Sequence, residues 1–95
     1  MGTDNRLGFY RAFDVWRKLD GRCLVRYRCF EFLASGKYSV QSADFYRFPL
    51  EPDQCAFLDK QFLELFVEQS PLDRGGGYDT IEEAIRAHDK DFENG

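Results

Sequence analysis

The stretch that most limits how this chain folds is residues 22–33, because a dipeptide suited to a hairpin turn flanks it on each side. Asp20-Gly21 stands just before it and Ser35-Gly36 just after it. Glycine tolerates the positive φ angles that two-residue hairpin loops require. The sequence therefore predicts that 22–33 is the middle strand of a three-stranded antiparallel sheet, with residues 9–19 and 37–48 as its neighbours.

Residues 50–69 have a helical pattern and not a strand-like one, because their apolar side chains recur at helical spacing. Pro52 suits the first helical turn, where its missing N–H costs nothing. Ser70-Pro71 should end the helix, since the residue before a proline is pushed out of the α region. The pattern predicts an amphipathic helix between these two prolines.

A second helix is expected from residue 81 to about residue 92. Thr80 and Glu83 have the spacing of a capping box, in which each side chain bonds a backbone N–H of the first turn. His88 lies beside the apolar stripe of this helix. We expect it to pack on the sheet, because the sequence offers no partner for a metal-binding or catalytic histidine.

These elements predict an α+β fold with the order strand, strand, strand, helix, helix, and with both helices packed on one face of the sheet. A chain of 95 residues with 43% hydrophobic residues forms one domain. We expect residues 1–95 to make up that domain, with 1–8 and 93–95 as frayed tails.

Composition argues against several classes of protein. No apolar run approaches the roughly 18 residues that span a bilayer, and no secretory signal is recognisable, so a cytoplasmic protein without membrane contact is expected. The three cysteines are an odd set without CxxC spacing, which favours reduced thiols over a disulfide framework. No metal site and no cofactor is expected.

If both hairpin loops have two residues, the register pairs Trp16 with Val25 and Cys29 with Ser42. The side chains then divide into two faces by parity. The first, here called the tyrosine face, carries Tyr10, Trp16, Tyr27, Tyr38 and Tyr46. The second, the arginine face, carries Arg11, Arg17, Arg22, Arg26, Arg28, Lys37 and Arg47, interleaved with Phe9, Phe13, Phe30, Phe32 and Phe45.

The sequence leaves two arrangements of the helices open. Burying Arg26 and Arg28 costs several kcal/mol unless they are paired, which favours helices on the tyrosine face. Conversely, phenylalanine has no polar tip and favours burial, so the helices could cover the arginine face with its arginines reaching helical Asp and Glu.

Basic and acidic residues are distributed unevenly between the two halves of the chain. Residues 1–48 hold nine Lys/Arg against five Asp/Glu, and residues 49–95 hold four against twelve. An uncovered arginine face would be an apolar patch with a positive rim, and such patches mark partner sites. The candidate binding residues are Arg11, Phe13, Arg26, Arg28, Phe30, Phe45 and Arg47.

The hypothesis that follows is a small non-enzymatic protein-interaction module that binds another protein or a second copy of itself. Single-stranded nucleic acid is an alternative partner for the same face, although the net charge of −4 opposes it. A lesser alternative is that the acidic helices mimic a partner. Another is a small enzyme in which Asp14 and Asp44 flank Tyr27, but no activated nucleophile supports catalysis.

Overall fold

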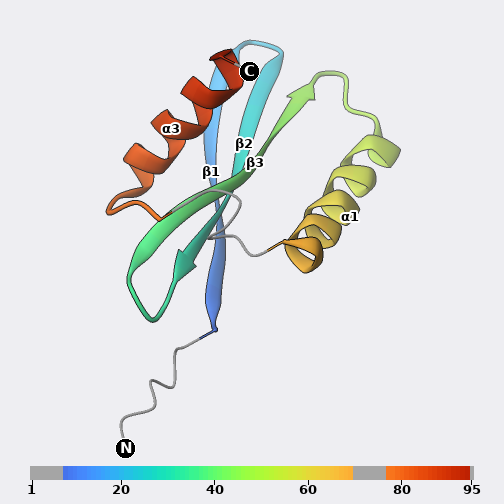
Figure 1. Ribbon diagram of the computed structural model, residues 1–95. Coiled ribbons are helices and arrows are strands. Elements are labelled where there is room, and N and C mark those ends of the chain that lie inside the picture. Colours follow the sequence, from blue (N-terminus) through green and yellow to red (C-terminus); the bar gives the residue numbers. More distant parts are fainter. Residues whose placement is uncertain (1–7, 70–76, 95) are drawn as a thin grey trace, which may run out of the picture.

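A computed structural model of the chain describes residues 8–69 and 77–94, with side chains as far as residue 91. It contains a three-stranded antiparallel meander followed by two helices that both contact β3 (Figure 1). This confirms the predicted α+β fold class. The elements are β1 (Tyr10–Asp20), β2 (Cys23–Phe32), β3 (Lys37–Arg47), α1 (Pro52–Glu68) and α3 (Ile81–Asn94).

Parts of three sequence predictions lie outside the described residues. They are the frayed segments at 1–7 and 95 and the helix stop at Ser70-Pro71. Within the described residues, Pro52 is the first residue of α1, as expected. The N–H of Glu83 donates to Thr80 Oγ1 at 3.2 Å, which confirms the predicted cap of α3.

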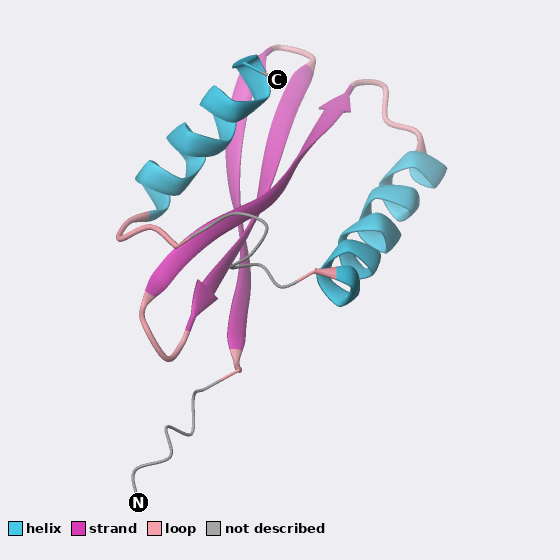
Figure 2. Cartoon of the chain, viewed as in Figure 1, coloured by secondary structure: helices cyan, strands magenta, loops and turns pink. Residues whose placement is uncertain are grey.

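The two helices lie on opposite sides of the sheet (Figure 2). The ring of Phe62 in α1 stacks on Phe30, with centroids 5.6 Å apart, whereas Ala84 in α3 belongs to a buried cluster with Cys29. Successive residues of a strand point to opposite faces, so Cys29 and Phe30 face different helices. The prediction that both helices pack on one face is therefore wrong, and β2 is covered on both sides.

The register between β1 and β2 differs from the prediction by one residue. Trp16 pairs with Arg26 and not with Val25. The strands close at Asp20 and Cys23, so the two-residue turn lies one residue later in the chain than predicted. Asp20 Oδ1 accepts the N–H of Arg22 at 2.7 Å and stabilises this turn. An irregularity between residues 18 and 20 then sets the register of the rest of the hairpin.

The register between β2 and β3 differs as well, since Cys29 pairs with Val40 and Ser42 pairs with Arg28. The connecting turn has four residues, 33–36, instead of two. Gly36 has a φ of 72°, a conformation that favours glycine, and its N–H donates to the Phe32 carbonyl. A second irregularity between Arg28 and Cys29 shifts the pairing once more.

These shifts redistribute the predicted faces. Phe13 pairs with Cys29 and Val15 with Tyr27, so Phe13 and Tyr27 lie on the same side of the sheet. A one-residue slip moves every side chain of a strand to the other face. The arginine face predicted from the sequence is therefore not a continuous surface.

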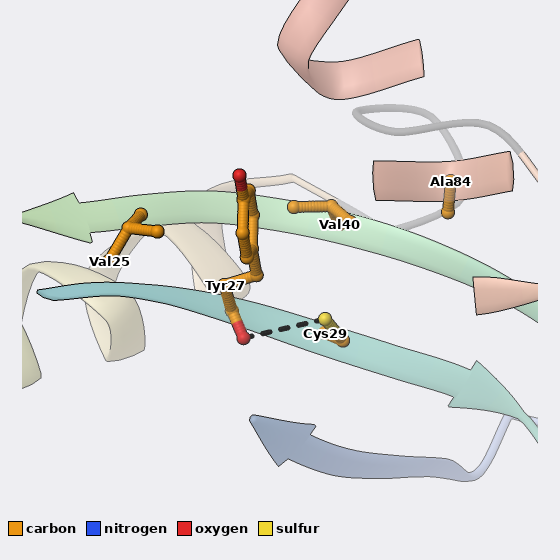
Figure 3. Close-up of a cluster of buried hydrophobic side chains, with 5 residues drawn as sticks. All are labelled: Val25, Tyr27, Cys29, Val40 and Ala84. Carbon is orange, nitrogen blue, oxygen red and sulfur yellow. Dashed lines mark hydrogen bonds between the residues drawn. The ribbon is translucent and has the colours of Figure 1, made fainter. Parts of the chain in front are cut away.

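The core beneath α3 is a compact cluster (Figure 3). Its buried members are Val25, Tyr27, Cys29, Val40 and Ala84. The Cys29 thiol donates to the Tyr27 carbonyl at 3.4 Å. Burial, with a smaller contribution from the charge of Asp14, raises the pKa of Cys29 to about 12. This thiol is thus a protonated core group at neutral pH.

Tyr27 also anchors α3 through its hydroxyl, which donates to the Asp89 carboxylate at 3.0 Å. Burial and this hydrogen bond raise the pKa of Tyr27. The half-buried ring of His88 meets the Tyr27 ring edge-on, with centroids 6.3 Å apart. The expectation that His88 packs on the sheet is confirmed.

Candidate binding groove beside helix α1

Helix α1 attaches to the sheet mainly through the aromatic residues of its C-terminal half. The Phe66 ring lies 4.6 Å from Phe30 and 5.7 Å from Tyr10, measured between centroids. The Gln41 side-chain amide donates to the Phe62 carbonyl at 3.2 Å, which ties the helix backbone to β3. No residue of α1 is fully buried, so the helix packs only partly against the sheet.

The N-terminal half of α1 leaves a cavity of about 230 Å³ against the sheet, which we call the α1 groove. Three large apolar residues on it remain exposed to solvent, namely Trp16, Phe48 and Leu50. The groove therefore presents apolar surface that nothing in the described part of the chain covers. It is lined by Trp16, Leu24, Arg26, Tyr46, Phe48, Leu50, Cys55 and Asp59.

Arg26 forms the polar part of the groove. Its guanidinium lies over the Trp16 ring at 5.4 Å, and its Nη2 donates to Asp14 Oδ2 at 2.8 Å. Its Nη1 donates to the Tyr46 hydroxyl at 3.3 Å and lies 3.6 Å from Asp59 Oδ1. Burial alone would lower the pKa of Arg26, but Asp14 and Tyr46 outweigh burial and raise it. Arg26 is therefore a permanent cation whose charge is already matched.

Arg28 is the second arginine under α1, and only 5% of its side chain is exposed. Its Nε donates to Asp44 Oδ2 at 2.5 Å and its Nη2 to Asp59 Oδ1 at 2.6 Å. The hydrogen bond from Arg28 holds the pKa of Asp59 below its usual range. A guanidinium is tolerated here because carboxylates pair with it from both β3 and α1.

α1 contributes Cys55 and one charged residue, Asp59, to the lining of the groove. Residues 51–68 contain five Asp or Glu and one Lys. Asp59 keeps 62% of its side chain exposed, although its Oδ1 pairs with Arg26 and Arg28. Asp14 and Asp44 bind the same two arginines. Three carboxylates thus surround two arginines, which leaves one net negative charge beside the groove.

The seven binding residues expected from the sequence do not share one surface. Arg28 and Phe30 are buried beneath α1, and Arg26 is half-buried there. The register places the other four on the side of α3, namely Arg11, Phe13, Phe45 and Arg47.

Arg11 and Phe13 also have partners of their own. Arg11 Nε donates to Glu31 at 2.7 Å, and its guanidinium lies 4.7 Å from the centre of the Phe13 ring. Sequence reasoning missed the groove residues Phe48 and Leu50. The available signal was an apolar run that continues past β3 into the loop before α1.

The geometry also bears on the other hypotheses for this chain. With Arg28 and Phe30 buried, the centre of the predicted basic-aromatic platform cannot stack bases or contact phosphates. Asp14 and Asp44 bind Arg26 and Arg28 on the α1 side, while Tyr27 lies on the α3 side. They do not flank Tyr27, which removes the acid–base arrangement considered from the sequence.

We found no match to this chain among protein-family models, curated proteins or solved structures. Among the described residues, no three His, Cys, Asp or Glu side chains are grouped so that they could hold a metal ion. None of the described helices has the length and apolar character needed to cross a membrane. The α1 groove is thus the feature on which a functional argument can be based.

Proposed function

We propose that this chain is a protein-interaction module in which the α1 groove receives an apolar side chain from a basic segment of a partner protein. The observation that carries this proposal is the groove itself, an apolar cavity with Trp16, Phe48 and Leu50 left exposed around it. Aromatic residues beside a pocket are the usual anchors of protein–protein interfaces.

The size of the groove favours a side chain over a small-molecule ligand. Pockets for cofactors and drug-sized ligands enclose about 300–1,000 Å³. The α1 groove encloses about 230 Å³ and is open at its mouth, as Trp16 and Leu50 are partly exposed. A leucine, methionine or phenylalanine side chain presented by a peptide fits such a volume.

Charge favours a basic segment around that anchor. Asp59 is exposed at the groove, where three carboxylates surround two arginines, and residues 51–68 as a whole hold five acidic residues against one basic residue. Like charges across an interface are unfavourable, and complementary charges speed the encounter. A partner with Lys or Arg next to its apolar anchor therefore meets a complementary surface.

The proposal is tested by selecting peptides from a random displayed library on the full chain. We expect enriched sequences that combine one large apolar residue with flanking Lys or Arg. Trp16 is the only tryptophan, so peptides without tryptophan can be titrated through its fluorescence. Their affinity should fall at high salt because part of the attraction is electrostatic.

Two variants with the same new charge separate groove binding from surface adhesion. Leu50→Asp places a carboxylate in the lining of the groove, whereas Val67→Asp places one at a position that is 88% exposed and outside that lining. We expect Leu50→Asp to abolish peptide binding and Val67→Asp to retain it. Equal binding by both variants, or a selection that enriches no basic apolar motif, would refute the proposal.

A further inference from the structure

β1 is an edge strand with hydrogen-bonding capacity that no described strand uses. The sheet order is β1-β2-β3, so β1 pairs on one side only. The N–H of Leu33 donates to the Phe9 carbonyl, and in an antiparallel ladder such bonded pairs recur at every second residue. The backbone groups of the even residues, Ala12, Asp14, Trp16 and Lys18, therefore point away from β2.

We propose that two copies of this chain pair through these edges, β1 against β1, to form one continuous six-stranded antiparallel sheet. A long edge strand is a template for a further strand unless it is short, bulged or covered. β1 spans 11 residues, its one irregularity lies at its end, and most of its residues are exposed, whereas most residues of β2 are buried. The occupant that matches this edge best is β1 of a second copy.

Charge selects the register of the pairing. In a symmetric antiparallel dimer one residue lies opposite its own copy. Centring the pair on Asp14 or on Arg17 puts like charges directly opposite each other, which destabilises a sheet. Centring it on Val15 places Asp14 opposite Trp16, whereas centring it on Trp16 places Lys18 opposite Asp14 twice, which adds a cross-strand cation to the Arg26 that Asp14 already binds. The dimer is therefore centred on Trp16.

This register also joins the two groove sites. Trp16 lines the α1 groove and is 52% exposed in the single chain. Cα atoms of a hydrogen-bonded antiparallel pair lie about 5.5 Å apart, so the two Trp16 side chains are neighbours on the face that carries both grooves. Each copy then contributes its tryptophan to the rim of its partner's groove, and burying the exposed ring stabilises the pair.

The first test is the mass of the full chain in solution as a function of concentration. Multi-angle light scattering should give twice the 11.1 kDa of one chain, and the fluorescence of Trp16 should shift to the blue as the dimer forms. Lys18→Glu should return the protein to a monomer, because the new carboxylate at position 18 would lie opposite Asp14 of the second copy and repel it. Lys90→Glu, at an exposed position of α3, makes the same change of charge and should remain dimeric.

The register is tested by oxidation in a background of Cys55→Ser. Trp16→Cys should form a disulfide between copies, whereas Val15→Cys should not, because residue 15 lies opposite residue 17 of the second copy. A monomer at every concentration, or a dimer that persists in Lys18→Glu with unchanged affinity, would overturn the proposal. Faster cross-linking by Val15→Cys would overturn the register and the shared rim. Peptide binding has its own test in Leu50→Asp and Val67→Asp, so a chain that stays monomeric and still binds basic apolar peptides would refute the dimer alone.

Discussion

Arg28 Nη2 and Asp59 Oδ1 lie 2.6 Å apart and join the middle of β2 to α1 across 31 residues of sequence. Asp44 holds the Nε of the same guanidinium from β3. The buried Arg28 thereby connects three elements with two carboxylates. Because α1 has no fully buried residue, this contact and the Phe30 cluster hold it to the sheet. The ion-pair network of Arg28 is therefore one of the contacts that set the position of α1 and of the groove beside it.

The two carboxylates of Arg28 should contribute unequally to stability. Asp44 is buried with the arginine, so Asp44→Asn removes a buried partner and should cost about 3 kcal/mol of unfolding free energy. Asp59 is 62% exposed, and Asp59→Asn should cost less than about 1 kcal/mol. Urea denaturation measures both values. Equal losses would mean that the burial of the pair has no energetic consequence.

The docking of α1 should weaken in acid. Asp59 has a pKa below its unfolded value of about 3.9, so its stabilising contribution is complete above that value and is lost as the pH falls through the folded pKa. We expect unfolding free energy to decrease below about pH 4, and to decrease less in Asp59→Asn. Glu64→Gln, at an exposed position of the same helix, is the matched control, and its loss of unfolding free energy in acid should equal that of wild type.

Phe30 should be the most sensitive apolar position under α1. It is fully buried and contacts Phe62 and Phe66, so Phe30→Ala should cost about 3–5 kcal/mol of unfolding free energy. Phe57, on the same helix but 60% exposed, provides the comparison, and Phe57→Ala should change stability by less than about 0.5 kcal/mol. A mild effect of Phe30→Ala in chemical denaturation would mean that α1 does not pack on this ring.

Cysteine labelling should distinguish the groove from the core. Cys55 lines the α1 groove and is half-buried, whereas Cys23 and Cys29 are buried. Because the pKa of Cys29 is raised to about 12, its thiolate is scarce at neutral pH. A maleimide should therefore modify Cys55 first in the native protein, and all three cysteines after unfolding. Peptide mapping that finds Cys29 modified as fast as Cys55 would contradict this burial.

The sequence by itself determined the order and approximate limits of the elements, because these depend on local chemistry. Pro52 marks the start of α1 and Thr80 caps α3, each through its own backbone or hydroxyl. The strands follow from their β-branched and aromatic content, and Gly36 supplies the positive φ of the second turn. Such signals act within a few residues and can be read without knowledge of the rest of the chain.

Only the tertiary structure decided which side chains share a surface. The irregularities between Lys18 and Asp20 and between Arg28 and Cys29 each shift a register by one residue, and in a strand with a side-chain period of two such a shift exchanges the faces. The tertiary structure also decided which carboxylates compensate the buried arginine. The sequence marked the burial of Arg28 as costly, but its partners Asp44 and Asp59 lie 16 and 31 residues away and meet it only after the sheet and α1 have assembled. The α1 groove has the same origin, since strand, loop and helix residues line it together.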